Sequence, residues 1–197
     1  LTGNFSLILI YIIFFIIEEK LLAEKIKFFF NRLTTKNVLK KINSDVFKYF
    51  QIKTFTSFLT GIFTFLILYF FNSDLAPTLG IFAFFLNFIP FVGSLISILI
   101  PTIFSLIQFF SFFESIIILI MLTFSQILIG NFLETKMMGK TLNLSPIIMI
   151  VFLSIMGKVW GIAGMFLSVP ILVFLLIIFS NLNSTKNIAI FISEKIK

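Results

Sequence analysis

Six stretches of this chain contain no charged residue, and they are long enough to cross a lipid bilayer. They cover residues 1–17, 54–73, 75–113, 115–133, 141–157 and 159–185. A helix needs roughly 20 apolar residues to span the hydrocarbon core, within a range of about 17–25. The sequence therefore predicts an all-α fold, a polytopic transmembrane helical bundle.

Composition excludes the common soluble classes and most catalytic chemistry. Of the 197 residues, 59% are hydrophobic and 12% are charged, and the chain has neither cysteine nor histidine. This removes disulfides, thiol nucleophiles, thiolate zinc sites and imidazole chemistry. Glu114 and Glu134 lie at opposite ends of a predicted helix, roughly 30 Å apart, and cannot act as a carboxylate pair. We expect no enzyme, catalytic residue, cofactor or metal site.

The chain divides into four predicted segments. Residues 1–17 are the end of a transmembrane helix, and residues 18–53 are an amphipathic cytoplasmic helical segment of two helices, with a polar turn and a helix start at 31–37. Residues 54–180 form the transmembrane core, and residues 181–197 form a cytoplasmic tail with a weak helical pattern. The amphipathic segment either lies on the membrane surface or packs on the bundle. The start at Leu1, inside an apolar stretch, favours an N-terminally truncated chain or an unusual start.

The run from 75 to 113 is too long for one helix and short for two spans with a loop. Its middle reads Asn87-Phe88-Ile89-Pro90-Phe91-Val92-Gly93. Pro90 donates no backbone hydrogen bond, and Gly93 lowers helix propensity. Two alternatives remain: two spans joined by a tight turn, or a re-entrant hairpin that enters and leaves on the same side.

Polar groups within or beside the later spans each allow two interpretations. Gln126 either lines a transport path or hydrogen-bonds a neighbouring helix. Glu134 is either a surface carboxylate paired with Lys136 or Lys140, or a proton-coupling group.

Residues 141–157 and 159–179 are predicted to form a final hairpin. Lys158 and Trp160 would lie near its tip. Gly157 and Gly161 match the small-xxx-small spacing, but the intervening lysine favours a tight turn over a helix-pairing face.

Positive charge is distributed unequally between the two predicted sides. The segments at 18–53, 134–140 and 181–197 hold 14 of the 15 Lys and Arg residues. Because basic residues gather in cytoplasmic loops, this places those segments, and the C-terminus, in the cytoplasm. The same reasoning accounts for the net charge of +7 without nucleic acid as a partner.

Three stretches resemble the autoinducer-2 exporter family of bacterial membrane transporters. They are Tyr49-Phe50-Gln51-Ile52-Lys53-Thr54 continuing to Gly61, then Asn87 to Gly93 with Pro101, and finally Gln126 through Leu142-Asn143-Leu144-Ser145-Pro146 and Trp160-Gly161-Ile162-Ala163-Gly164-Met165 to Pro170. The order and spacing agree over almost the whole chain. Thr135 and Ser94 stand where the family often has proline, and the family's further N-terminal spans are absent from this sequence.

The resemblance implies a multi-pass transporter of the bacterial inner membrane that exports autoinducer-2. Its alternatives are a sodium or lithium–proton antiporter, and a non-transporting fragment of a split transporter gene. The expected partners are the lipid bilayer and a small polar solute, with a homo-oligomer as a further expectation. The residues expected along the solute path are Asn87, Pro90, Gly93, Gln126, Asn131, Glu134, Ser145, Pro146, Gly161, Gly164 and Pro170.

Overall fold

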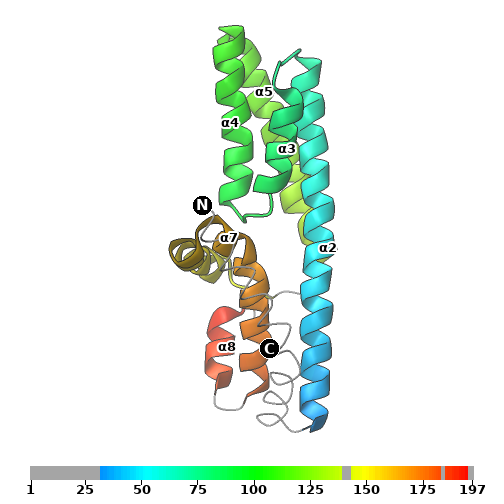
Figure 1. Ribbon diagram of the computed structural model, residues 1–197, viewed down its shortest axis with the longest axis vertical. Helices are drawn as coiled ribbons and strands as arrows, with labels where there is room; N and C mark the ends of the chain where they lie inside the picture. Colours follow the sequence, from blue (N-terminus) through cyan, green and yellow to red (C-terminus); the bar gives the residue numbers. More distant parts are fainter. Residues whose placement is uncertain (1–31, 139–142, 183–184, 195–197) are drawn as a thin grey trace, which may run out of the picture. The chain divides into compact units, whose positions relative to one another are not determined.

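The computed structural model describes residues 32–138, 143–182 and 185–194, and their regular structure is helical. The elements in chain order are α2 (Arg32–Phe70), α3 (Ala76–Leu86), α4 (Val92–Phe109), α5 (Phe112–Gln126), the π-helix η1 (Ile127–Glu134), α6 (Thr135–Met138), α7 (Pro146–Asn181) and α8 (Lys186–Ile192) (Figure 1). The chain separates into two compact units, Leu1–Lys41 and Ile42–Lys197, and the description below concerns the second.

Four helices in the described part of the chain are long and apolar enough to cross a membrane. They are Asn37–Phe70, Val92–Phe109, Phe112–Met138 and Pro146–Asn181. This confirms the all-α polytopic bundle. The predicted end of a helix at 1–17 lies outside the described residues.

Helix α2 passes without interruption from the polar to the apolar part of the sequence. No proline or glycine occurs between Arg32 and Thr60, so nothing in this stretch breaks the helix. The predicted boundary between 53 and 54 therefore falls inside one helix. The helix start expected within 31–37 is confirmed, because α2 begins at Arg32, and the residues from Arg32 onward are helical and form no turn.

Helices α3 and α4 form an antiparallel hairpin, and the short length of α3 favours the re-entrant alternative for residues 75–113. With 11 residues, α3 is about 16 Å long, roughly half of a hydrocarbon core. Ser73 at the end of α2 donates a 3.1 Å hydrogen bond to Gln108 at the end of α4, so the hairpin starts and finishes on the same side. Figure 1 shows α3 running away from that side and α4 returning to it.

The depth of the hairpin tip follows from its hydrogen-bond partners. Asn87, at the end of α3, bonds to Ser57 and to Gln126. Ser57 lies 13 residues before the end of α2, and Gln126 lies 14 residues after the start of α5. At 1.5 Å per residue, both counts place the tip about 20 Å from the Phe70 end of α2 and from the Phe112 end of α5.

The tip closes in a narrow turn. Phe91, with φ 59° and ψ −58°, is the centre of a γ-turn in which the amide of Val92 donates to the Pro90 carbonyl at 2.6 Å. A Cβ atom on Gly93 would lie 1.7 Å from the carbonyl oxygen of Leu86. Only glycine allows α4 to start this close to the end of α3.

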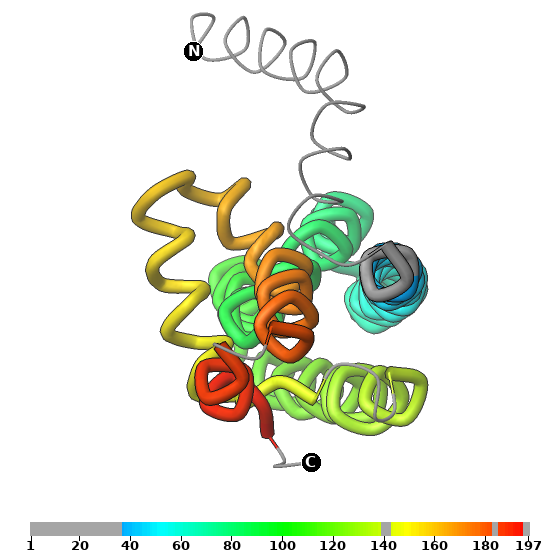
Figure 2. Tube along the Cα trace, turned by 90° about the horizontal axis from the view of Figure 1, so that it is seen from below, coloured from blue at the N-terminus to red at the C-terminus, as the bar shows by residue number. Residues whose placement is uncertain are grey.

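Helix α7 bends sharply at Gly161 (φ 62°, ψ −142°), and this corrects the predicted hairpin. Figure 1 shows its first leg nearly end-on and its second leg along the vertical axis, and Figure 2 shows the reverse. The two legs are therefore not antiparallel. Glycine adopts this conformation readily, and Gly164 packs so closely on Met156 that a Cβ would meet its carbonyl oxygen at 2.1 Å.

The predicted helical pattern in the tail corresponds to α8. An antiparallel bridge between Leu144 and Ser193 joins the end of α8 to the segment before α7. The amide of Ser145 donates to the carbonyl of Ile192 at 2.9 Å.

Candidate functional site

One face of α2 carries buried polar side chains through an apolar region. Its members, at helical spacings of i, i+3, i+4, i+7 and i+11, are Lys53, Thr56, Ser57, Thr60 and Thr64. All are at most 5% exposed. Burying a polar group costs free energy unless the group is hydrogen-bonded, so the partners of these side chains indicate the role of this face. We call these five residues the polar face of α2.

Asn87 at the hairpin tip is the centre of the first group of contacts. Its side-chain amide donates to the Ser57 hydroxyl at 3.1 Å, and its Oδ1 accepts from Nε2 of Gln126 at 3.0 Å. Asn87 is 1% exposed and Gln126 is 9% exposed. We call these three residues the amide cluster. It joins α2, α3 and α5 through side chains that can exchange partners with a polar solute.

A buried ion pair forms the second group of contacts. Nζ of Lys53 donates to Oε1 of Glu134 at 2.7 Å, and the two side chains are 6% and 15% exposed. The Thr56 hydroxyl lies 3.1 Å from Oε2 of Glu134 and 3.2 Å from the carbonyl oxygen of Lys53. Thr56 and Ser57 are consecutive, so the ion pair and the amide cluster meet on the polar face of α2.

The π-helix η1 explains why Glu134 reaches this face. In an uninterrupted α-helix, Glu134 follows Gln126 by eight residues, so its side chain would lie about 80° around the helix axis from that of Gln126. A π segment accommodates an extra residue, which removes about 100° and leaves the two side chains within about 20° of each other. Gln126 and Glu134 therefore both face α2. Gly130 lies between them, and a Cβ there would meet Nε2 of Gln126 at 3.3 Å.

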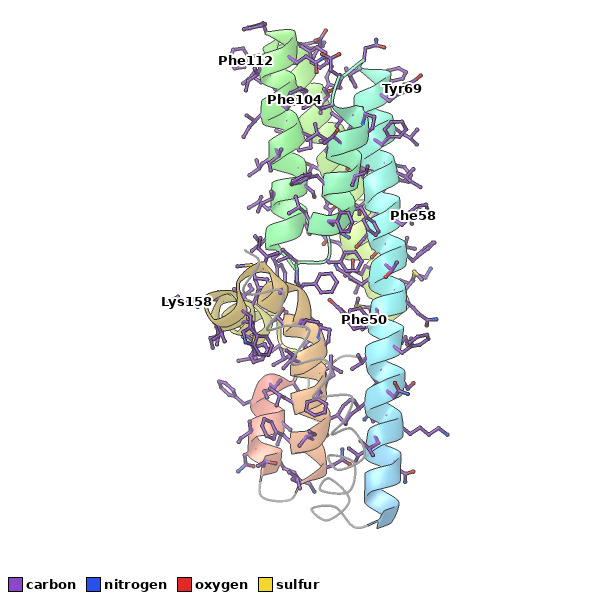
Figure 3. All side chains as sticks on the ribbon, in the orientation of Figure 1. Phe50, Phe58, Tyr69, Phe104, Phe112 and Lys158 are labelled. Carbon is purple, nitrogen blue, oxygen red and sulfur yellow. The ribbon has the colours of Figure 1, made fainter. Side chains whose placement is uncertain are left out.

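Aromatic rings from three elements contact one another beside the hairpin tip. The ring of Phe88 stacks on Phe166 of α7 with centroids 4.8 Å apart, and Phe166 lies 6.3 Å from Phe50 of α2. Figure 3 shows Phe50 on the side of α2 facing α7, whereas Phe58 lies on the other side of α2 in this view and is 55% exposed. The second leg of α7 thus contacts the residue next to Asn87.

The structure brings together some of the predicted path residues. Asn87, Gln126 and Glu134 join the two groups of contacts, and Pro90 and Gly93 shape the hairpin tip. For Gln126, the interpretation as a hydrogen-bonding partner of a neighbouring helix is confirmed.

Other predicted path residues lie apart from these contacts. Asn131 is exposed on η1. Ser145 and Pro146 form the start of α7, and Gly161, Gly164 and Pro170 belong to its bend and second leg. In the part of the chain that the structure describes, none of these six hydrogen-bonds to the amide cluster.

Glu134 is paired with Lys53 and not with Lys136. Lys136 instead lies over the ring of Phe132, 5.6 Å from its centroid, and Lys140 is outside the described residues. Lys53 is itself buried, at 5% exposure, and sequence reasoning did not single it out as a site residue. A signal existed in the sequence: five polar residues at helical spacing on one face of a predicted helix.

Among the described residues, no group of three or more acidic side chains could hold a metal ion. The candidate site therefore offers neutral hydrogen-bonding groups and one ion pair. Such a set suits recognition and passage of a solute.

The sequence profile of the AI-2E family transporters matches residues 1–184. The chain belongs to this family. It is 38% identical over 155 residues to a putative transport protein of Borreliella burgdorferi, covering 78% of this chain and 43% of that protein. It is 29% identical over 197 residues to the AI-2 transport protein TqsA of Escherichia coli K12, covering 98% and 56%.

A third relative is the putative transport protein YhhT of Escherichia coli K12, 30% identical over 166 residues, covering 84% of this chain and 47% of that protein. The chain spans about half the length of the curated relatives it matches. Family membership and the four candidate spans together establish a multi-pass membrane protein of a transporter family.

Proposed function

We propose that this protein exports a small polar solute across the bacterial inner membrane, and that the solute passes the amide cluster. Autoinducer-2 is the first candidate solute, because a relative over nearly the whole chain is named an AI-2 transport protein. The proposal assigns the chain no catalytic step and places its C-terminus in the cytoplasm.

The observation that carries the proposal is the position of the amide cluster. It lies at the tip of the hairpin formed by α3 and α4, about 20 Å from the Phe70 end of α2 and from the Phe112 end of α5. Irregular backbone at membrane depth is tolerated where it is buried in protein or lines a wet cavity. Broken helices near mid-membrane are also where transporters commonly build their binding sites.

The side chains of the cluster suit a neutral polar solute. The amides of Asn87 and Gln126 each offer donors and acceptors, and Ser57 adds a hydroxyl that both donates and accepts. In the described state these groups satisfy one another. A solute with several hydroxyl groups could replace those mutual bonds without leaving a buried polar group unpaired.

A second candidate function is cation–proton antiport, and the buried carboxylate of Glu134 favours it. Ionisable residues within membrane segments mark ion pathways and proton relays. The amide cluster is uncharged and offers both donors and acceptors, which suits a neutral polar solute, so we rank solute export first.

Flux in reconstituted vesicles tests the proposal. Asn87→Leu should abolish uptake of autoinducer-2 into inverted vesicles, while Asn131→Leu, the same change at an exposed position outside the cluster, should leave it unchanged. Equal yield and helix content of both variants would show that folding is intact. Normal flux through Asn87→Leu would contradict the route.

A further inference from the structure

We propose that the groove between α2 and α3 binds one phospholipid, with an acyl chain in the groove and an ammonium headgroup at Asp74. Phosphatidylethanolamine has this chemistry. None of the residues that line the groove belongs to the amide cluster, so this is a separate site. The proposal does not depend on which solute the protein carries.

Two glycines form the floor of the groove. Gly61 of α2 and Gly80 of α3 face each other, and a Cβ atom on Gly61 would lie 2.9 Å from the carbonyl oxygen of Gly80. A Cβ atom on Gly80 would lie 2.8 Å from the Cβ atom of Phe65. The two backbones therefore approach closely at this level. A hollow remains above them, because neither glycine has a side chain that could fill it.

The walls of the groove are aromatic and aliphatic. Phe58 and Phe65 stand on α2, and Ile81 and Phe84 stand on α3, around a volume of about 400 Å³. That volume falls in the range of about 300–1,000 Å³ that is typical of small-molecule pockets. Phe58 and Ile81 are 55% and 60% exposed, so the groove is open in the described part of the chain. The lining residues carry no charged or hydrogen-bonding side chain, which suits a hydrocarbon chain.

The depth of the groove identifies hydrocarbon as its surroundings. Phe65 and Phe58 lie 5 and 12 residues before Phe70, where α2 ends. The groove therefore extends from about 8 Å to about 18 Å from that end of the helix. One leaflet of the hydrocarbon core is about 15 Å thick. An acyl chain that enters from the Phe70 end can follow the groove along its length, whereas water is excluded at this depth.

Charge at the open end of the groove selects the headgroup. Asp74 is exposed and lies three residues before Pro77, the lining residue nearest the start of α3. Glu114, in the first turn of α5, adds a second carboxylate at this end of the bundle. The described residues 66–78 and 106–116, which form this end, include no lysine or arginine. Such a surface attracts an ammonium group and repels the anionic headgroup of phosphatidylglycerol.

Tyr69 marks the level of the headgroup. It is 66% exposed, and its ring centroid lies 5.6 Å from that of Phe65, so it continues the aromatic wall toward the end of α2. Figure 3 shows Phe58 and Tyr69 on the same edge of α2, with Tyr69 nearer that end. Tyrosine is enriched where hydrocarbon meets the headgroups, because its ring is apolar and its hydroxyl is polar. This hydroxyl can donate a hydrogen bond to the lipid phosphate.

A lipid in this groove supports the hairpin. Helix α3 starts at Ala76 and ends next to Asn87, and its residues Ile81 and Phe84 would pack on the bound chain. Within a bilayer, close packing holds neighbouring groups together, since the lipid tails are as apolar as the side chains. The bound lipid therefore contributes to the position of α3 and, through it, to that of the amide cluster.

Native mass spectrometry of the full chain tests the site. The purified protein in micelles is given equimolar phosphatidylethanolamine and phosphatidylglycerol with the same acyl chains. We expect one retained phospholipid per chain, with phosphatidylethanolamine preferred by about threefold, the factor that an exposed ion pair supplies. Absence of a retained phospholipid, or equal retention of the two, would overturn the proposal.

Two pairs of variants assign the lipid to this groove. Ile81→Trp fills the groove and should lose most of the retained lipid, whereas Ile103→Trp, at a similarly exposed position on α4, should retain it. Asp74→Asn should lose the preference for phosphatidylethanolamine and still retain lipid, whereas Glu114→Gln, outside the groove, should keep the preference. Unchanged retention in Ile81→Trp, or an unchanged preference in Asp74→Asn, would contradict the assignment.

Photocrosslinking of the unaltered chain tests the same site without any substitution. Vesicles of phosphatidylethanolamine and phosphatidylglycerol include a small share of phosphatidylethanolamine with a diazirine on one acyl chain, and cross-linked peptides are identified after illumination. Cross-links should be more frequent in residues 58–65 and 77–84 than on the exposed face of α4 at 95–103. If another segment of the chain or a second copy covers the groove, its residues will carry no cross-links and the proposal fails.

Discussion

Replacing Lys53 and Glu134 one at a time and then together measures how strongly the buried ion pair holds α2 to η1. Removing one partner from a buried pair typically costs about 3–5 kcal/mol, because the other charge stays buried without compensation. Glu134 keeps 15% exposure, so we expect each of Lys53→Met and Glu134→Gln to cost about 3 kcal/mol.

The double variant removes both charges and should be far less destabilising than the sum. A glutamine at 134 can still accept a hydrogen bond from Thr56, and neutral replacement of a buried pair is often close to neutral in stability. We therefore expect a coupling free energy of at least about 3 kcal/mol from the double-mutant cycle.

Equilibrium unfolding of the full chain in mixed micelles, followed by circular dichroism, supplies the four free energies. Glu114→Gln with Lys158→Met is a suitable control pair, because these residues lie outside the ion pair and should be additive within about 0.5 kcal/mol. A coupling below about 1 kcal/mol for Lys53 and Glu134 would be the value of an exposed pair, and would refute the buried description.

Three further predictions follow from the backbone geometry and the charge distribution. Gly93→Ala should unfold the hairpin tip or cost about 3 kcal/mol or more in the same unfolding assay, because its Cβ would lie 1.7 Å from a backbone oxygen; stability equal to that of wild type would contradict the tight approach. Gly161→Ala meets no atom within 4 Å, so its cost should be only the backbone strain of about 1–3 kcal/mol, and a clash-sized loss would be unexpected. Because the chain has no cysteine, Asn72→Cys should react with an impermeant maleimide in intact cells and Asn183→Cys should be protected; the opposite pattern would reverse the proposed orientation.

The helical class and the break near Pro90 could be predicted because each depends on local sequence. Charge-free runs reveal helices whose surroundings are apolar, and proline followed by glycine marks a place where a helix ends. The choice between two spans and a re-entrant hairpin could not be made this way. It depends on where Asn87 finds its partners, Ser57 and Gln126, which are 30 and 39 residues away in sequence.

The ion pair shows a second limit of local reasoning. Lys136 is close to Glu134 in sequence and was the expected partner, but the actual partner Lys53 is 81 residues away. An α-helical projection also places the Glu134 side chain about 80° around the helix axis from that of Gln126, so it does not predict that both face α2. The π-helix that aligns them is not apparent from the sequence. The polar face of α2 was missed, although helical spacing could have shown it, since that pattern lies within one uninterrupted helix.

The bend in α7 lies within one residue of the predicted tip at Trp160, but its geometry was predicted incorrectly. Two charge-free runs separated by a single lysine suggest antiparallel spans. The torsion angles of Gly161 instead turn the second leg across the first. The conformation of a single glycine therefore decides this part of the fold.

Accessibility of Asn87 is the measurement that tests the central claim most directly. The chain lacks native cysteine, so Asn87→Cys provides a single thiol at the amide cluster. If the solute passes this cluster, the thiol should react with a small hydrophilic methanethiosulfonate reagent, and autoinducer-2 should slow that reaction. Phe58→Cys, one residue beyond Ser57 but on the other side of α2 from Phe50 in Figure 3, should stay inert under both conditions. An inert Asn87→Cys, or a reaction that autoinducer-2 does not slow, would contradict the proposed route.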